Sequence, residues 1–373
     1  MSFADIIGQE TALAALRAAV AHDNIPQAYL FLGPDGVGKM TAAVEFAKAL
    51  NCAQREPGEG DACDACVNCT RIAADQHPDV QRIAPDGEQT KIWQFWTRSG
   101  HPPGALESIN FAPVAAPRRV YLIERAETLN EEAANSILKA LEEPPPYVHF
   151  VLCAPSQTAV LPTILSRCQL IRFRQVPQDR LADALTARKA LDPEEARLLA
   201  AYAEGAPGRA LRLAETPELR GQREALLDLA ARIADSPVIA AFRLAEDLRA
   251  AAKTKAKKGE DDGEADRTAR GDLTRALDVL MAWHRDLLAL SLRGPDAPIV
   301  HTDQRAALLI AARRYAPDQI AQNVEALFAF RRHVERNANA QLATEVLMLR
   351  LVPRKTPAAP GADKAPPPVP KRS

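Results

Sequence analysis

The 373-residue sequence has no excess of charge of either sign and no long apolar run. Its formal net charge is −1, which gives no overall electrostatic reason for binding nucleic acid, although a local basic patch can still exist. No apolar stretch approaches the length of a membrane span, and residues 1–10 lack the layout of a signal peptide. We therefore expect a cytoplasmic protein without a membrane partner.

The composition is that of a soluble globular protein. Hydrophobic residues make up 47% of the chain and charged residues 25%. A chain of this length exceeds one ordinary hydrophobic core, so two or three domains are expected. Of the six cysteines, four lie together between residues 52 and 69, which favours a metal site over scattered disulfides.

The short apolar stretch at residues 29–32 predicts a buried parallel strand, and a glycine-rich turn follows it. Gly33, Gly38 and Lys39 fit the spacing G-x-x-x-x-G-K of a phosphate-binding loop, with Gly36 between them. Glycines let backbone N–H groups surround a phosphate, and the N-terminus of the following helix adds positive potential. The lysine supplies a charge for the outer phosphates. This stretch therefore predicts a site where ATP or ADP can bind.

The same loop departs from its motif at the metal position. The motif has Ser or Thr after the lysine, with a hydroxyl that binds magnesium, but here the residue is Met40. Thr41 is also a candidate loop residue. It comes one place after the metal position, so its side chain points about a hundred degrees away from that position around the helix. The loop is predicted to hold phosphate and to hold the metal poorly.

A second departure follows the predicted strand at residues 120–123. In a phosphate-loop ATPase this strand ends in Asp-Glu, the first residue for magnesium and the second for the attacking water. Here the pair is Glu124-Arg125. Glutamate can still reach a metal, but an arginine, with a pKa above about 12, cannot act as a general base. Hydrolysis is therefore not expected.

Four cysteines follow the spacing C-x10-C-x2-C-x2-C: Cys52, Cys63, Cys66 and Cys69. Four thiolates with two tight C-x-x-C steps suit a tetrahedral structural zinc site with Zn–S bonds of about 2.3 Å. A redox C-x-x-C pair and an iron–sulfur cluster are the alternatives, but a redox pair does not need four cysteines. We expect zinc that fixes an inserted loop and takes no part in catalysis.

Several motifs occur in one order along the first 215 residues: Gly8-Gln9, the phosphate loop, the four cysteines, His77-Pro78-Asp79, N-x-x-L-K-x-L-E-E-P-P at 135–145, and Ser166-Arg167-Cys168. In combination they closely resemble the subunits of the bacterial DNA polymerase III clamp loader, an AAA+ assembly. The resemblance implies an α/β P-loop (AAA+) core with a zinc-binding insertion, followed by an all-α lid and an all-α collar domain. His77 alone is given no chemical role.

Within that family the chain looks more like the delta-prime class, which keeps the fold without the chemistry, than like the ATP-hydrolysing gamma/tau class. Met40 and Arg125 are two reasons. The third is Gly208, which stands where the ATPase subunits have a lid arginine that contacts the phosphates; Arg209 is adjacent but would face elsewhere on a helix. A gamma/tau-like ATPase with unusual motifs is the alternative, and an AAA+ protein outside replication is a weaker one.

Arg167 is the candidate catalytic residue, acting in trans. In this family the Ser-Arg-Cys arginine enters the ATP site of the neighbouring subunit, where a guanidinium stabilises charge on the transferring phosphoryl group. Out of this context, a salt-bridged arginine after a strand would be the better interpretation. The resemblance also implies the partners: gamma/tau and delta subunits, and through the complex the sliding clamp and primed DNA.

The predicted organisation has four parts. Residues 1–175 form the core, with the zinc module at 52–69; residues 176–216 form the lid, 217–353 the collar and 354–373 a disordered tail. The charge run 253–266 has too few apolar residues to fold and is expected to be a solvated loop. In the collar, apolar stripes are expected along 273–288, and along 324–331 continuing at Leu342, Val346, Leu349 and Leu351.

Overall fold

The computed structural model describes residues 2–87, 89–253, 262–335 and 339–353. The chain divides into two compact units: Met1–Arg220 with Val300–Asp303, and Gly221–Ile299 with Gln304–Ser373. The further division into core, lid and collar stays a prediction. Among the described residues no helix combines the length and the apolar character that crossing a membrane requires.

The first unit contains a five-stranded parallel sheet in the order β2-β3-β4-β1-β5. Its strands are β1 Ala28–Leu32, β2 Val80–Ile83, β3 Arg119–Ile123, β4 Val148–Ala154 and β5 Gln169–Arg172. The predicted strands at 29–32 and 120–123 are confirmed as β1 and β3, and β2 was not predicted. The first unit therefore contains the parallel sheet that an α/β core was predicted to have.

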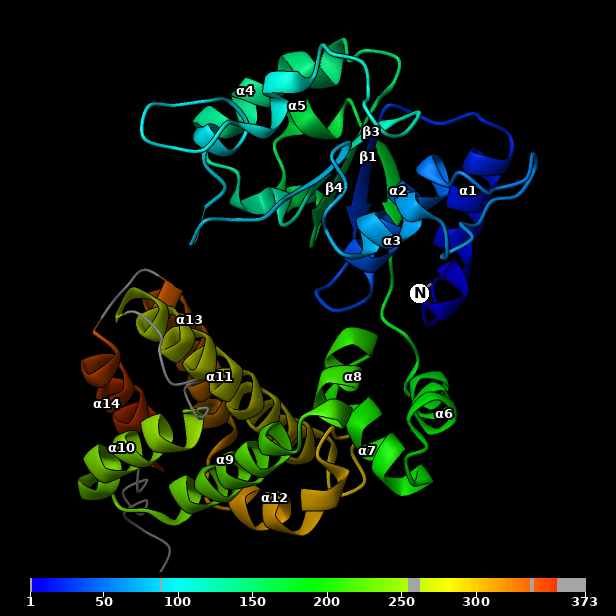
Figure 1. Cartoon of the computed structure of the whole chain (residues 1–373). Helices are drawn as coiled ribbons and strands as arrows, with labels where there is room; N and C mark the ends of the chain where they lie inside the picture. The colour runs from blue at the N-terminus through cyan, green and yellow to red at the C-terminus, as the bar shows by residue number, and fades with distance from the viewer. Residues whose placement is uncertain (1, 88, 254–261, 336–338, 354–373) are drawn as a thin grey trace, which may run out of the picture. The chain divides into compact units, whose positions relative to one another are not determined.

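Alternate strand residues face opposite sides of this sheet and meet different helices. Tyr29 and Phe31 of β1 pack with helices α1 and α2, whereas Leu30 and Leu32 pack on the side of α4 and α5. Figure 1 shows α1, α2 and α3 on one face and α4 and α5 on the other. Both faces are thus covered, which explains why the central strands are apolar throughout.

The helices of the first unit are α1 Glu10–Ala21, α2 Lys39–Asn51, α3 Val67–Ala73, α4 Glu131–Glu142, α5 Pro162–Leu165, α6 Gln178–Lys189, α7 Pro193–Tyr202 and α8 Pro207–Glu215. Asn130 caps the start of α4: its side-chain oxygen accepts a hydrogen bond of 2.8 Å from the N–H of Ala133. Short 3-10 turns cover Phe3–Asp5, Ile92–Gln94, Ala105–Ser108, Ala126–Thr128 and Gln157–Ala159.

Asp79 holds together the irregular chain that precedes β3. Its fully buried carboxylate accepts hydrogen bonds from the backbone N–H groups of Val114, Ala115 and Ala116, at 2.7–3.1 Å. It also pairs with the buried guanidinium of Arg119 at 3.2 Å. Burial acts to raise the pKa of this carboxyl group, but the backbone donors and Arg119 outweigh it and hold the pKa below its usual range. Asp79 is therefore a structural residue.

Replacing Asp79→Asn is expected to lower the free energy of unfolding of the first unit by about 3–5 kcal/mol, because Arg119 keeps its charge in a buried place. The contribution of the wild-type carboxylate is present above the ordinary Asp pKa of about 4 and is lost as the pH falls through the lower folded-state value. Urea denaturation at pH 7 and at pH 3 measures both effects. Asp86→Asn, which removes a half-exposed pair with Lys91, should cost less than about 1 kcal/mol.

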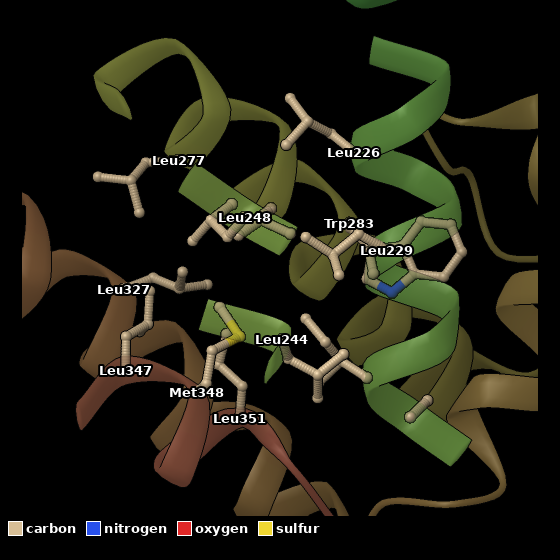
Figure 2. Close-up of a cluster of buried hydrophobic side chains, with 14 of the residues drawn as sticks. Leu226, Leu229, Leu244, Leu248, Leu277, Trp283, Leu327, Leu347, Met348 and Leu351 are labelled. Carbon is tan, nitrogen blue, oxygen red and sulfur yellow. The ribbon is translucent and has the colours of Figure 1, made fainter. Parts of the chain in front are cut away.

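The second unit is built from helices around one apolar core. They are the main part of α9 Pro217–Asp235, then α10 Ala241–Ala252, α11 Asp262–Arg293, α12 Arg305–Ala312, α13 Pro317–Glu335 and α14 Ala340–Leu351, with 3-10 turns at Val238–Ala240 and Thr302–Gln304. Figure 2 shows leucines of α9, α10, α13 and α14 with the fully buried Trp283 of α11. The predicted stripe on α11 is confirmed at Leu273, Leu277, Leu280, His284 and Leu287, all buried.

Two expectations for this unit are wrong. On α14 the predicted Leu351 is buried, but Leu342, Val346 and Leu349 are exposed, because the buried face of the helix runs through Thr344, Leu347, Met348 and Leu351. Within the charge run, residues 262–266 belong to α11 and not to a loop. Residues 254–261 and the predicted tail at 354–373 lie outside the described residues.

Candidate nucleotide site and cysteine cluster

A cavity of about 460 Å³ opens beside the phosphate loop. Its walls come from three neighbouring strand ends: the start of α2 after β1, Glu124 after β3, and Cys153, Ala154 and Pro155 at the end of β4. The carboxyl ends of parallel strands are the usual ligand site of open α/β sheets. The structure thus brings Gly36, Gly38, Lys39 and Thr41 of the predicted phosphate loop to one cavity; Gly33 does not line it.

The loop has the conformation that its glycines permit. Gly38 precedes the first residue of α2 and has a φ of 103°, in the region that side chains disfavour. The backbone N–H groups of residues 36–41 donate to no acceptor within the described part of the chain. These donors and the N-terminus of α2 therefore create positive potential at the cavity.

Lys39 points back into its own loop. The Nζ donates to the carbonyl oxygen of Gly33 and, at 2.9 Å, to that of Pro34, and lies 3.4 Å from the carboxylate of Asp35. The side chain is only 8% exposed at the cavity wall. A bound phosphate would offer this ammonium a charged oxygen in exchange for two neutral carbonyls, which favours anion binding.

The metal side of the cavity is altered beyond what the sequence predicted. Met40 lines the wall where a hydroxyl would bind magnesium, and Glu124 forms an ion pair with Arg82 of β2. A guanidinium on this carboxylate opposes the approach of a divalent cation by charge repulsion. Arg125, which has a left-handed φ of 50°, pairs with Glu127 at 3.4 Å. None of these side chains can serve as a general base beside a magnesium ion without rearrangement.

The start of α8 forms another part of the cavity wall. The N–H of Gly208 donates to the carbonyl oxygen of Gly36 at 2.8 Å. A Cβ atom at position 208 would meet that oxygen at 3.1 Å, so a larger residue there would need the loop to shift. One turn later, Arg212 lines the cavity, whereas Arg209 does not. The residue adjacent to Gly208 thus faces elsewhere, as predicted, while position 212 returns to the same face.

The four predicted cysteines form one cluster. The Sγ atoms of Cys52, Cys63, Cys66 and Cys69 all lie within 4.8 Å of one another. The Sγ atoms of Cys63 and Cys69 are 4.0 Å apart, close to the edge of about 3.8 Å that a tetrahedron with Zn–S bonds of about 2.3 Å requires. Burial, and then the neighbouring thiols, raise the pKa of Cys69, a cost that a bound cation would remove. The cluster can therefore hold a metal ion.

Ion pairs fasten this insertion to the helices of the sheet. Arg17 of α1 pairs with Asp61 at 3.0 Å, and Lys48, which is 1% exposed in the last turn of α2, pairs with Asp64 between Cys63 and Cys66. The side-chain amide of Asn68 donates to the carbonyl oxygen of Asn51 at 2.8 Å. The insertion is thus connected to the same helix whose first residue is Lys39.

Arg167 lies between α5 and β5 and does not line the cavity of its own chain. Its guanidinium donates to the carbonyl oxygen of Thr163 at 2.7 Å and pairs with Glu142 at the end of α4. About a third of the side chain is exposed, so the guanidinium is held by its neighbours but still reaches solvent. Glu142 belongs to the E-E-P-P motif, so the structure brings together two segments that the sequence analysis had kept apart.

Comparison with known proteins adds to this geometry. Residues 8–177 match the family described as DNA polymerase III, delta subunit. The DNA polymerase III subunit delta' of Bacillus subtilis (strain 168) is 26% identical over 343 residues, which cover 92% of this chain and 96% of that protein. The chain is thus similar to subunits of the DNA polymerase III clamp loader. The tau subunit of Escherichia coli (strain K12) is 34% identical, over 57% of this chain and 32% of its own length.

Among solved structures, a gamma-subunit-related protein of DNA polymerase III from Thermotoga maritima aligns with 92% of this chain and all of its own. The identity is 18% and the TM-score 0.48, too distant to add to the sequence matches. This chain spans about a third of the tau subunit and nearly all of the delta' subunit.

Sequence reasoning missed several residues that line the cavity, among them Arg82 and Arg212. Arg212 could have been found, because it stands four positions after Gly208 and such residues share a helix face. Arg82 could not, because its pairing with Glu124 depends on β2 lying beside β3, and β2 was not recognised as a strand.

Proposed function

We propose that this chain is a delta-prime-type subunit of the DNA polymerase III clamp loader, part of the holoenzyme, which places the sliding clamp on primed DNA. Its proposed partners are gamma/tau and delta subunits, and through the complex the clamp and primed DNA. The match to the delta' subunit of Bacillus subtilis over nearly both full lengths supports this choice. As a replication subunit it would act in the cytoplasm, and its cysteine cluster would hold structural zinc.

The proposed site binds ATP or ADP and does not hydrolyse it. One observation carries this proposal: the phosphate side of the cavity keeps Lys39 and the donors of the loop, while the metal and water side holds Met40, Arg125 and the Arg82–Glu124 pair. Phosphoryl transfer needs both sides. A site with only the first is suited to binding.

The purified chain is therefore expected to show no ATP turnover above the Lys39→Ala background. Loss of the metal ligand and of the general base removes two contributions that are each worth orders of magnitude in rate. A phosphate-release assay with and without magnesium measures this. Robust turnover that disappears in Lys39→Ala would contradict the proposal and restore the ATPase interpretation.

We assign the chain's catalytic contribution to Arg167, acting at the ATP site of a neighbouring subunit. The side chain is partly exposed, it does not line its own cavity, and its guanidinium carries the planar donor pattern that suits phosphate oxygens. Its present partners, Glu142 and a backbone carbonyl, lie at the surface, where an ion pair contributes little. A neighbour's phosphate could therefore compete with them.

A gamma/tau-like ATPase is the second candidate. The 34% identity with the tau subunit over 220 residues is higher than the identity with the delta' subunit, and this favours it. It requires the Arg82–Glu124 pair to open when magnesium binds. The turnover assay above separates the two candidates, because only this one predicts hydrolysis by the chain alone.

A further inference from the structure

The charges around the cavity are almost completely paired with one another. Three acidic side chains line it, and each is paired with a cation of the same wall: Asp35 with Lys39, Glu124 with Arg82, and Glu127 with Arg125. The fourth cation of the wall is Arg212. No ion pair or hydrogen bond to a described residue is formed by its side chain. Each acidic side chain of the wall thus has a cationic partner, and one arginine is available for an anion.

A magnesium ion would find few suitable ligands in this arrangement, because each acidic side chain of the wall already has a cationic partner and Thr41 supplies the one hydroxyl among the lining residues. Magnesium requires hard oxygen ligands in near-octahedral geometry, and the thioether of Met40 does not supply one. The carboxylate of Glu124 would have to exchange the guanidinium of Arg82 for the ion. At the end of β4, Cys153, Ala154 and Pro155 offer no side-chain oxygen either. The cavity therefore disfavours the divalent cation that normally accompanies ATP.

A polyphosphate, in contrast, would find three sets of positive groups. The N–H donors of residues 36–41 belong to the phosphate loop. Lys39 lies in the wall of the cavity, and Arg212 of α8 lines the same cavity. Arginine binds phosphate oxygens through two N–H groups at once and is always charged. Its position on α8 places a further cation in the wall of the same cavity.

We propose that this cavity binds the polyphosphate chain of a nucleotide without a divalent cation, and that Arg212 supplies the positive charge that the metal supplies in a hydrolysing site. The inference rests on the proposed function, in which nucleotide is bound and not cleaved, and it adds the chemical form of the ligand. The ligand then connects α8 to the phosphate loop, which Gly208 and Gly36 already join through one hydrogen bond.

Isothermal titration of the full chain with ATP and ADP, in excess magnesium and in excess EDTA, tests the proposal. Binding is expected in EDTA, at least as tight as in magnesium, because the metal reduces the charge of the ligand. Arg212→Ala should weaken binding in EDTA by about tenfold or more, the value of a lost charged hydrogen bond. Arg209→Ala is the matched control: it removes the same charge from the same helix at a position outside the cavity, and it should leave the affinity unchanged.

A gain-of-function variant tests whether the cavity can be changed to accept magnesium. Met40→Ser with Arg82→Ala adds the hydroxyl and frees Glu124, so magnesium should now tighten ATP binding, whereas it does not in the wild type. Titration with pyrophosphate distinguishes nucleotide from inorganic polyphosphate, because both ligands carry the same chain of phosphates. Equal affinity for pyrophosphate and ADP would assign the site to inorganic polyphosphate, and tighter binding of ADP would assign it to nucleotide.

Three results would overturn the inference: no binding in EDTA, binding only in magnesium, or equal losses in Arg209→Ala and Arg212→Ala. Circular dichroism of both variants confirms that they are folded. The proposed clamp-loader role would survive each of these results, because it is measured separately, by assembly and by the ATPase of the neighbouring subunits.

Discussion

Arg167→Ala is expected to reduce ATP hydrolysis at the neighbouring site that this chain serves by about 10³–10⁵-fold, the range for loss of an arginine that acts in trans. Folding and assembly should be nearly unchanged, because the Arg167–Glu142 pair is at the surface and such pairs contribute at most about 1 kcal/mol. The measurement compares thermal stability, complex assembly, clamp-stimulated ATPase and clamp loading for the reconstituted complex with wild-type and variant chains.

Two further variants separate catalysis from structure. Arg167→Lys should restore little activity, since an ammonium lacks the planar fork that spans two phosphate oxygens. Glu142→Gln removes the same ion pair and leaves the arginine in place, so ATPase should be retained. If Arg167 served only as the partner of Glu142, both alanine and glutamine variants would lose stability alike and lysine would substitute well. Wild-type ATPase and loading with Arg167→Ala would end the in-trans proposal.

Local patterns predicted the first unit well where the chain follows simple periodicity. Short apolar stretches predicted the strands at 29–32 and 120–123, and the cysteine spacing predicted the cluster, because each depends on residues close in sequence. The phosphate loop and the loss of its metal ligand at Met40 were also readable in this way. These features place one wall of the cavity.

The other wall depends on contacts between distant segments, which periodicity does not encode. Glu124 is neutralised by a residue of another strand, and β2 escaped prediction because it is short and only its end residues are buried. Arg167 meets Glu142 only because α4 and α5 pack together. On α14, nearly every face is apolar, so the sequence could not indicate that Leu347 and Met348, rather than Leu342 and Val346, turn inward.

The cysteine cluster gives the second large expected effect. We predict one zinc ion per chain, held with an apparent free energy of about 10–16 kcal/mol at pH 7, as in small zinc domains. Cys66→Ser should abolish stoichiometric zinc and raise amide hydrogen exchange in the insertion and α3 by about 10³-fold, equivalent to about 4 kcal/mol of local stability. Elemental analysis and hydrogen exchange followed by mass spectrometry measure the two effects. Cys168→Ser, outside the cluster, is the control and should keep its zinc.

The loss should remain local, because the sheet has its own core on both faces and does not need the insertion to bury it. Exchange in β1, β3 and β4 should therefore change little. The C-terminal turn of α2 is the exception: Lys48 is buried with Glu45 and loses its second partner when Asp64 moves, so protection there should fall as well. Purified protein with no metal, or with iron in place of zinc, would refute the assignment. Unfolding of the whole sheet in Cys66→Ser would instead show that the insertion is part of the main core.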